Sequence, residues 1–557
     1  MQSHFVTWVS GRLLCFTVLW NFISGTPEQP NIVIIVADDV GWNDVGFHGS
    51  DEIQTPNIDA LAYQGVVLTR HYTLPSCTPS RSALLTGRYP ITTGMQGYPL
   101  RAGEPRGVPL SVQLLPEHFK RIGYATHAIG KWHIGSHKSN FTPTYRGFDS
   151  HFGYWYGYVG YHNHSIEQEV PNHQPIQGLD MHRGLSAAWD TKGTYATELF
   201  TREAVSIIQH HNVSSPLLLY IGHLAPHSPL EVPDQAAADE RFSHITDPER
   251  RIYAEMLWHL DVSVGEVIKA LQQRDMLNNT VIVFISDNGG QPHGIHYNKA
   301  SNWPLRGTKF TLFEGGVRTV AALWTSKLRQ AGSISDIFVH ITDWLPTLYS
   351  AAGGNLSDLG PVDGVNLWPW LGASNSTHIP KGPPPRVGML LNIDEILGLE
   401  AIIHGRWKLT RGSFHNGQYD SHSGQTSQQP DGLDSIANAL SGSAAHALAA
   451  AGISGPTTRA QAFAVRSQAT INCQKEMSFL PTNLTGTPLC SSNYCLFNIF
   501  EDPCEVEDIA SSNPTIVTSL ILELNKFRSR LVPQTNCPVD ISSDPAQFNN
   551  TWHPWLD

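Results

Sequence analysis

Three short, continuous apolar runs are the clearest pattern along the chain. They cover residues 31–37, 216–222 and 280–286. Runs of this length without alternation are typical of central strands in a sheet that is covered on both faces. Helical periodicity lies between them, over residues 198–210 and 251–272. Alternating strands and helices predict an α/β fold with a large, mostly parallel central sheet.

Polar residues follow each of these runs and predict a functional edge of the sheet. Asp38 and Asp39 follow the first run, His227 lies beyond the second, and Asp287 and Asn288 follow the third. In open α/β sheets, ligands bind outside the carboxyl ends of the strands. The pattern therefore brings residues that are far apart in the sequence to one edge.

The pattern changes near residue 400, which predicts a second unit. Residues 401–409 have the pattern of a strand. Residues from about 420 to 470 contain few large apolar side chains and much Ser, Gln, Gly and Ala, which predicts a flexible insertion, although residues 435–450 could form an Ala-rich helix. Because 557 residues exceed one ordinary core, we expect a large domain over residues 26–400 and a smaller one over residues 401–557.

The composition is that of a globular protein and argues against nucleic acid as a partner. Hydrophobic residues make up 41% of the chain and charged residues 15%. The formal net charge is -12 with 27 histidines counted as neutral. Binding of nucleic acid needs a positive surface, which this balance does not provide. An acidic compartment would charge many of the histidines and reduce the net negative charge.

The first 25 residues have the features of a secretory signal peptide. Arg12 precedes a short apolar stretch over residues 13–23, and small residues follow. An uncleaved anchor is the alternative. No later stretch is long enough to span a membrane, so we expect no membrane span and a lysosomal or extracellular protein. Eight Asn-x-Ser/Thr sites support passage through the secretory pathway: Asn140, Asn163, Asn212, Asn278, Asn355, Asn375, Asn483 and Asn549.

The distribution of cysteines separates Cys77 from the rest of the predicted mature chain. Five others lie near the C-terminus, where an oxidising compartment favours disulfides. We predict a pair between Cys495 and Cys504, which flank a strand-like segment, and a second between Cys473 and Cys490, with Cys537 left over. Other pairings stay open, because connectivity cannot be deduced from sequence.

Asp38, Asp39, Asp287 and Asn288 form a candidate metal site. They offer only oxygen ligands, which suit Ca²⁺ or Mg²⁺ rather than zinc. The same residue types are common in turns that follow strands. Two such pairs at the ends of two strands, expected at one edge, favour a shared cation.

The longest motif surrounds Cys77. Residues 77–81 read Cys-Thr-Pro-Ser-Arg, and Leu-Thr-Gly-Arg follows at residues 85–88. A helix can begin near Ser80 and end at Gly87, and the N–H groups at its start favour an anion such as a sulfate monoester. The motif resembles the signature of the formylglycine-dependent, type I sulfatases. The resemblance implies that Cys77 is oxidised to Cα-formylglycine by the formylglycine-generating enzyme in the endoplasmic reticulum.

Further segments carry the same resemblance. Residues 130–135, Gly-Lys-Trp-His-Ile-Gly, match the second sulfatase signature, and residues 226–230 contain the family histidine. Residues 302–318 match the Leu-Arg-Gly-x-Lys and Glu-Gly-Gly-x-Arg run. The similarity covers about residues 30–410. The run at 302–318 and residues 340–348 look closest to the arylsulfatase B branch.

The resemblance implies the fold, the cofactor and the roles of residues. The fold is an alkaline-phosphatase-like sandwich with a large central sheet and a smaller C-terminal α+β domain that has an antiparallel sheet. One Ca²⁺, or Mg²⁺, is held by Asp38, Asp39, Cys77 as formylglycine, Asp287 and Asn288. The implied catalytic residues are Cys77, Arg81, Lys131, His133, His227 and Lys309. In this scheme Arg81 positions the aldehyde hydrate or the carboxylates, and the two lysines stabilise the sulfate oxygens. His227 and Lys309 can protonate the leaving alcohol, and His133 deprotonates the second hydroxyl.

The predicted function is that of an arylsulfatase-type sulfuric ester hydrolase. Its substrate is an aryl sulfate or a sulfated sugar, with N-acetylgalactosamine 4-sulfate of glycosaminoglycans as one candidate, and the reaction passes through a sulfo-enzyme intermediate. One alternative is a phosphatase or phosphodiesterase on the same superfold, with two zinc ions and Thr78 or another hydroxyl as the nucleophile. The other is an inactive protein that binds sulfated glycans. Residues 153–164, rich in aromatic and histidine side chains, either line the pocket or form a packed surface loop.

Overall fold

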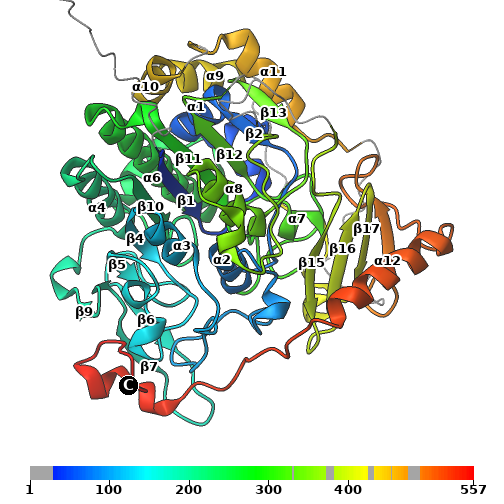
Figure 1. Cartoon of the computed structure of the whole chain (residues 1–557), viewed down its shortest axis with the longest axis horizontal. Coiled ribbons are helices and arrows are strands. Elements are labelled where there is room, and N and C mark those ends of the chain that lie inside the picture. Colours follow the sequence, from blue (N-terminus) through cyan, green and yellow to red (C-terminus); the bar gives the residue numbers. More distant parts are fainter. Residues whose placement is uncertain (1–28, 329–330, 372–381, 425–431, 453–454, 474–489) are drawn as a thin grey trace, which may run out of the picture.

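A ten-stranded sheet forms the centre of the fold (Figure 1). The computed structural model describes residues 29–328, 331–371, 382–424, 432–452, 455–473 and 490–557, so the predicted signal peptide lies outside the described residues. The strand order is β13-β2-β12-β11-β1-β10-β4-β5-β8-β9. In chain order the strands are β1 (Asn31–Ala37), β2 (Val66–Leu68), β4 (Ala125–Lys131), β5 (Ser150–Tyr154), β8 (His182–Arg183), β9 (Ser186–Ala187), β10 (Leu217–Gly222), β11 (Thr280–Ser286), β12 (Ala321–Thr325) and β13 (Ser333–Ser335).

The middle of the sheet is parallel, as predicted. Strands β11, β1, β10, β4 and β5 all run in the same direction, and only the strands beyond them add antiparallel pairs. The three apolar runs form β1, β10 and β11, which are neighbours in the sheet. Their carboxyl ends therefore meet at one edge, which confirms the expected arrangement.

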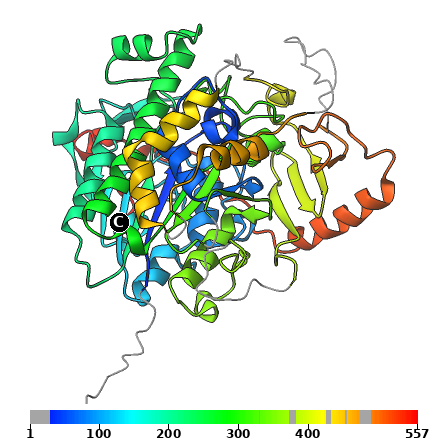
Figure 2. The ribbon, with the colours of Figure 1, turned by 90° about the horizontal axis from the view of Figure 1, so that it is seen from above.

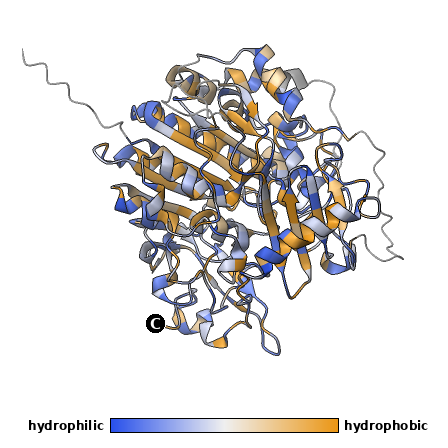
Figure 3. Cartoon of the chain, turned by 45° about the vertical axis from the view of Figure 1, so that its right-hand side comes forward, coloured by the Kyte–Doolittle hydropathy of each residue, from blue (hydrophilic) through white to orange (hydrophobic). Residues whose placement is uncertain are grey.

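Both faces of the sheet are covered by helices (Figures 1 and 2). Val33 and Ile35 of β1 belong to one hydrophobic core, and Ile32 and Ile34 belong to the other. Burying each such side chain stabilises the fold by roughly 1.5–3 kcal/mol. Figure 3 shows the same arrangement as apolar strands between helices that have one apolar and one polar side. The first core contains α1 (Pro56–Gln64), α4 (Ala196–His210) and α6 (Pro248–Gln273), and the second contains α2 (Cys77–Thr86), α3 (Leu115–Arg121) and α8 (Trp344–Ala351).

The two predicted long helices are confirmed as α4 and α6. Helix α6 begins at Pro248, three residues before the predicted start. The side chain of Asp247 accepts hydrogen bonds from the backbone N–H groups of Glu249 and Arg250, and a proline at the first helical position suits this start. Among the described residues, no helix combines the length and the apolar character needed to cross a membrane.

A smaller antiparallel sheet lies beside the large one. Its strands are β15 (Gly388–Asp394), β16 (Leu399–His404), β17 (Trp407–Arg411) and β18 (Cys495–Asn498), with α12 (Pro514–Arg528) against one face. The prediction of a single strand over residues 401–409 was wrong. Gly405, with φ 58°, allows a tight turn that divides this segment into β16 and β17.

The expected flexible insertion is helical where the structure describes it. Helices α9 (Gly432–Ser441), α10 (Ser443–Ala451) and α11 (Arg459–Ala469) cover this segment and pack near α1, in the core of the large sheet (Figure 2). The interpretation as a loop was therefore wrong for these residues, and the Ala-rich helix was the better alternative. Small buried side chains such as Ala444, Ala445 and Ala447 allow helices to approach closely.

The last residues of the chain also return to the large sheet, so residues 401–557 do not form one separate unit. The C-terminal segment runs from α12 to the hairpin of β6 (Ser165–Gln168) and β7 (Ile176–Leu179) (Figure 1). Trp552 is fully buried there. Its indole N–H donates to the Ile166 carbonyl at 3.3 Å, and its backbone N–H donates to the Leu179 carbonyl at 2.9 Å.

The predicted disulfide pairs were wrong. The structure joins Cys473 to Cys504 and Cys490 to Cys495, and Cys537 is free, as predicted. Strand β18 begins at Cys495 and leads away from it toward Cys504. Cys490 precedes Cys495 by only five residues, and their Cα atoms are 5.3 Å apart, within the range that a disulfide allows.

A buried lysine connects the two sheets. Lys408 on β17 lies between Glu314, in the short helix α7 (Glu314–Val317), and Glu505. Its Nζ is 2.9 Å from Glu314 Oε1 and 2.8 Å from Glu505 Oε1, and all three side chains are fully buried. The Glu505 carboxylate also accepts a hydrogen bond from the backbone N–H of Glu314.

The buried carboxyl of Asp59 on α1 makes stability depend on pH. Burial, and then the nearby Asp261 carboxylate, raise the pKa of Asp59 to about 8. A carboxyl whose folded pKa lies above its unfolded value of 3.8 contributes stability that is complete below pH 4 and is lost as pH rises through 8. Asp59→Asn is neutral at every pH. We therefore expect the unfolding free energy of the variant minus that of wild type to increase by roughly 2–4 kcal/mol from pH 4 to pH 8.

Chemical denaturation at several pH values measures this difference. Groups that do not interact with Asp59 titrate alike in the two proteins, so the comparison reports Asp59 together with its neighbour Asp261. Parallel pH profiles for the two proteins would contradict the prediction.

Candidate active site

Cys77 is the first residue of helix α2. This helix packs on one face of the large sheet, beside the carboxyl ends of its strands. The helix ends at Gly87, whose φ of 65° suits glycine, as predicted. From within the helix, the Ser80 hydroxyl holds the preceding segment: it accepts a hydrogen bond from the Leu74 backbone N–H and lies 3.1 Å from the Leu74 carbonyl. This turn places Cys77 among the free N–H groups of the first helical turn, which favour an anion.

The two aspartates that follow β1 each form a buried ion pair with a lysine. Lys131 Nζ is 2.7 Å from Asp38 Oδ2, and Lys309 Nζ is 2.7 Å from Asp39 Oδ2. Burial alone would lower the pKa of Lys309, but the charges around it, Asp39 foremost, raise that pKa instead. Lys309 is therefore protonated at any physiological pH.

Arg81 connects helix α2, which begins at Cys77, to Asp287 at the end of β11. Its Nε donates to Asp287 Oδ2 at 2.9 Å, and its Nη1 donates to the Tyr220 hydroxyl at 3.2 Å. Asp287 Oδ1 accepts a hydrogen bond from the backbone N–H of Asp39 at 3.3 Å. Asn288 Nδ2 donates to Asp39 Oδ1 at 2.6 Å. The structure thus brings together the oxygen ligands predicted from the ends of β1 and β11.

These residues fit a divalent cation. Asp38 Oδ1 and Asn288 Oδ1 are buried and have no hydrogen-bond partner among the described residues. Buried polar atoms are rarely left unpaired, because desolvation without a partner is costly. Ligand atoms of Asp38, Asp39 and His227 also lie within 4.8 Å of one another. Oxygen-rich sets of this kind suit a hard cation.

The thiol of Cys77 is not activated as a nucleophile. It is 3% exposed. Burial raises the pKa of the Cys77 thiol, although the nearby Lys131 and Lys309 oppose this effect. The thiolate, rather than the thiol, is the reactive form of cysteine. An unmodified Cys77 is therefore a poor nucleophile despite its central place.

His133 has one ring nitrogen available as a base. It follows β4 with a φ of 61°, and its Nε2 lies 2.8 Å from the Leu100 carbonyl. Because a carbonyl only accepts hydrogen bonds, Nε2 carries the proton and Nδ1 has a free lone pair. Nδ1 is buried and has no partner among the described residues. Burial, followed by the Lys131 charge, lowers the pKa of His133 well below its usual value.

His227 lies on the loop after β10. Its Nδ1 donates to the Ser228 carbonyl at 2.6 Å, so Nε2 points toward Asp39 Oδ2 at 3.6 Å. Burial, followed by the charges of Lys309 and Lys131, lowers the pKa of His227. The ring is therefore neutral in the described structure, with a lone pair on Nε2 for a cation or a donor group.

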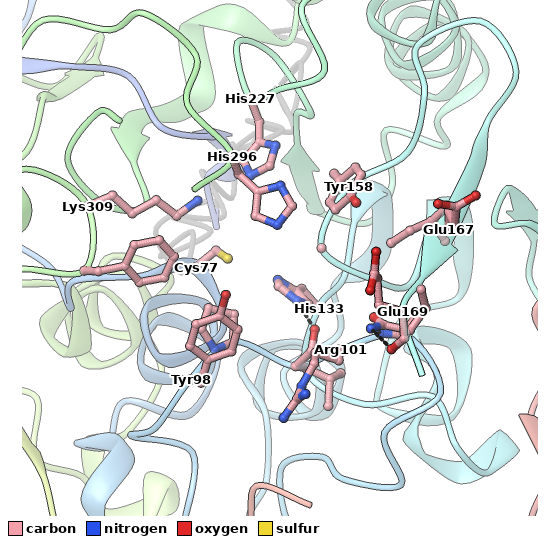
Figure 4. A pocket seen from close by; sticks show the side chains of 17 residues that line it. Cys77, Tyr98, Arg101, His133, Tyr158, Glu167, Glu169, His227, His296 and Lys309 are labelled. Atoms are coloured by element: carbon pink, nitrogen blue, oxygen red, sulfur yellow. Dashed lines mark hydrogen bonds between the residues drawn. The ribbon is translucent and has the colours of Figure 1, made fainter. Parts of the chain in front are cut away.

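A cavity of about 230 Å³ opens above Cys77 (Figure 4). Four predicted residues line it: Cys77, His133, His227 and Lys309. The other predicted residues do not line the cavity but lie behind this wall and are fully or almost fully buried: Asp38, Asp39, Arg81, Lys131, Asp287 and Asn288.

Much of the cavity wall could not be predicted from the sequence. Of the aromatic stretch at 153–164, Gly157 and Tyr158 line the cavity, whereas several of its other aromatic residues are buried. His296 carried no motif that could have indicated its place. The further lining residues that were missed are Tyr98, Pro99, Leu100, Arg101, Ala102, Ile166, Glu167, Gln168, Glu169 and Phe310.

Fold and site together define an enzyme that acts on an anionic ester. The sulfatase family model matches residues 30–354, and the chain belongs to the sulfatase family. Arylsulfatase J of Mus musculus is 35% identical over 529 residues, which cover 95% of this chain and 80% of that protein. N-acetylgalactosamine-6-sulfatase of Mus musculus is 33% identical over 367 residues, 64% of this chain and 69% of that protein. The crystal structure of Ps i-CgsB superimposes with a TM-score of 0.67 at 27% identity and covers 91% of this chain and 94% of its own. The sulfatase fold and the hydrolysis of sulfuric esters follow from this membership.

Proposed function

We propose that the protein is a formylglycine-dependent arylsulfatase that releases sulfate from a sulfated sugar or an aryl sulfate. The observation that supports this most directly is the buried, unactivated Cys77 thiol at the start of α2, within a site built for an anion. Conversion to formylglycine gives this position a hydrated aldehyde with two hydroxyl groups. The names of two relatives, an arylsulfatase and an N-acetylgalactosamine-6-sulfatase, support both substrate types.

The positive charges of the site bind the sulfate. A Ca²⁺ held by Asp38, Asp39, Asp287, Asn288 and residue 77, with Mg²⁺ as the alternative, would add charge for the sulfate oxygens when bound. Lys131 and Lys309 stabilise the charge that develops on those oxygens, and Arg81 fixes Asp287.

Proton transfer falls to the residues around the cavity. His133 uses its free Nδ1 to remove the proton of the second hydroxyl, because Nε2 is committed to Leu100. Lys309 remains protonated and can donate to the leaving oxygen. His227 is the second candidate for that role, but its Nδ1 already donates to Ser228, so it can donate from Nε2 only after it has taken up a second proton.

Maturation is proposed to take place in the secretory pathway, with a lysosomal or extracellular destination. The two disulfides of the described residues fit an oxidising compartment. Six predicted glycosylation sites that the structure describes are exposed: Asn140, Asn163, Asn212, Asn278, Asn355 and Asn549. The formylglycine-generating enzyme would be the partner during maturation.

The structure argues against Thr78 as the nucleophile of a phosphatase. Thr78 is fully buried, and its hydroxyl donates to the His133 carbonyl at 3.1 Å. The same oxygen accepts a hydrogen bond from the Leu100 backbone N–H at 3.0 Å. These two hydrogen bonds hold the Thr78 hydroxyl between two segments of backbone, so it is not available for attack on a substrate.

Mass spectrometry of the tryptic peptide of residues 71–81 tests the proposal first. Protein made in a eukaryotic secretory host is expected to carry formylglycine at position 77 and to hydrolyse p-nitrophenyl sulfate. An unconverted cysteine, in a host that converts a control sulfatase, would favour the inactive glycan-binding alternative.

Removal of the cation provides a second test. Prolonged dialysis against a chelator is expected to reduce sulfate release by at least about a hundredfold, because the cation stabilises developing negative charge. Addition of Ca²⁺ or Mg²⁺ should restore the activity. Metal analysis should give one such ion per chain, whereas two zinc ions per chain would support the phosphatase alternative.

Gly157→Ala tests the role of His133. A Cβ at Gly157 would lie 3.2 Å from Cε1 and Nε2 of the His133 ring, so the ring must shift. We expect kcat to fall by about a hundredfold, because general bases act only in a narrow geometry. Gly442→Ala is the control, since the nearest atom to its Cβ is the Asn438 carbonyl at 3.7 Å. Equal kcat values for the two variants would contradict the assignment.

A further inference from the structure

We infer that the cavity contains a second subsite, formed by Glu167, Glu169, Tyr158 and His296, that binds the uncharged pyranose ring of a sulfated sugar. The inference rests on the proposed function, since it concerns the part of the substrate that does not carry the reacting sulfate. Such a subsite favours a neutral sulfated sugar over an anionic chain that contains uronic acid.

Two carboxylates lie at the end of the cavity away from Lys309. Glu167 belongs to β6 and Glu169 follows it, and both line the cavity and are exposed (Figure 4). Among the described residues, neither carboxylate has a hydrogen-bond or ion-pair partner within the protein. Carboxylates only accept hydrogen bonds, so these two oxygen pairs are suited to the hydroxyl groups of a ligand.

The position of these carboxylates is fixed relative to the catalytic residues. Gln168, which lies between them, accepts a hydrogen bond from the Ala102 backbone N–H at 3.2 Å through its Oε1. Two residues earlier in the same loop, the Leu100 carbonyl accepts from His133. The hairpin of β6 and β7 is further held by Trp552, whose indole donates to Ile166. The subsite is therefore attached to the same loop as the proposed base.

Aromatic rings form the wall between the two subsites. Tyr158 and His296 lie with ring centroids 5.0 Å apart, and Tyr158 also stacks on His227 at 5.8 Å with an angle of 19°. The flat, C–H-rich face of a pyranose packs well on such rings, while its hydroxyl groups point outward. A ring held here would present its hydroxyl groups toward the carboxylates and its sulfate toward Cys77 (Figure 4).

The charge around the mouth disfavours a uronate. Apart from Lys309, the charged side chains that line the cavity are Glu167, Glu169 and Arg101. Arg101 lies on the opposite side from Tyr158 in Figure 4. Two negative charges against one positive charge, on a chain of net charge -12, repel a neighbouring carboxylate more than they attract it.

Matched substrates test the inference. The first is the methyl glycoside of a sulfated N-acetylgalactosamine, with the sulfate at the position that the enzyme hydrolyses. The second is the disaccharide that carries the same sulfated sugar next to a uronic acid, and p-nitrophenyl sulfate is the third. We expect wild type to have a kcat/KM at least about tenfold higher for the glycoside than for the disaccharide.

The variant Glu167→Gln/Glu169→Gln removes both charges and keeps the shape. We expect its kcat/KM to fall by about tenfold on the methyl glycoside, mainly through KM, as for lost hydrogen bonds to charged groups. On p-nitrophenyl sulfate it should stay within about twofold of wild type, since this substrate lacks hydroxyl groups for the carboxylates. Its kcat/KM on the disaccharide should rise. Glu523→Gln on α12 is the matched control, because Glu523 does not line the cavity, and it should resemble wild type on all three.

The outcomes separate the two proposals. A preference of wild type for the disaccharide, or an unchanged kcat/KM of the double variant on the glycoside, would overturn the subsite while p-nitrophenyl sulfate is still hydrolysed. An equal loss on all three substrates would also overturn it, since that marks a general effect on the fold. If formylglycine-containing wild type hydrolyses none of the three, the proposed function fails and the subsite with it.

Discussion

The Cys77→Ser protein is expected to take up one sulfate per chain and then stop. A serine at the start of α2 retains one hydroxyl that can attack the sulfate ester. The product is a serine sulfate without a second hydroxyl on the same carbon. His133 Nδ1 then has no proton to remove, and the ester cannot be expelled by elimination. Steady turnover should fall by a factor on the order of 10⁴ or more, as for the loss of other nucleophiles.

Intact-protein mass spectrometry after incubation with p-nitrophenyl sulfate measures this result. The serine variant should gain the mass of one SO₃ group, and Cys77→Ala should gain none. Cys537→Ser is the matched control, because Cys537 is the other free cysteine among the described residues and does not line the cavity. It should turn over like wild type. Multiple turnover by Cys77→Ser would show that release does not need the second hydroxyl.

Lys408→Met is expected to destabilise the protein by about 3–5 kcal/mol, the usual cost of breaking a buried ion pair by removing one partner. Lys408 serves two buried carboxylates at once. Burial alone would raise the pKa of Glu314, but the charges of Lys408 and Arg318 keep that pKa below its usual value. Burial is not fully offset for Glu505, whose pKa is raised to about 7. Without the lysine, Glu314 keeps Arg318 and Tyr72 as partners, whereas Glu505 loses its ion pair while it remains buried.

Urea denaturation measures the loss, and two further variants define its origin. Glu505→Gln in the Lys408→Met background removes one buried charge and should recover part of the stability. Lys526→Met breaks an exposed pair with Glu523 and should change stability by no more than about 0.5 kcal/mol. A loss below about 1 kcal/mol for Lys408→Met would show that water reaches the pair in solution.

The central sheet, and the meeting of oxygen-bearing side chains at its edge, could be predicted from the sequence because their signals are local. The apolar runs of β1, β10 and β11 identify strands buried on both faces, and parallel strands bring their carboxyl ends together. Asp38 and Asp287 could therefore be placed at one edge of the sheet from the pattern of residues alone. The longest motif likewise located Cys77 at the start of a helix.

Other parts of the fold depend on packing that has no local signal. Helix α10 is buried through small alanines that approach α1 closely, whereas large apolar side chains are the usual sign of burial in a sequence. The disulfide of Cys473 with Cys504 depends on the direction in which β18 leaves Cys495. Glu167 and His296 reach the cavity only because a hairpin and a loop fold over it, which no periodicity or motif indicates.

The burial of Cys77 limits the time available for its proposed oxidation. In the finished protein the side chain is 3% exposed, so a modifying enzyme cannot reach it once the surrounding strands are in place. Lys309, which closes one side of the cavity, is synthesised roughly 230 residues later, on the order of 10–50 s at the usual speed of translation. The proposed oxidation therefore has to precede folding around Cys77, and this interval passes before the chain that completes the cavity has been made. A cell that translates this message faster, or contains too little of the modifying enzyme, would accumulate a correctly folded protein that stays inactive.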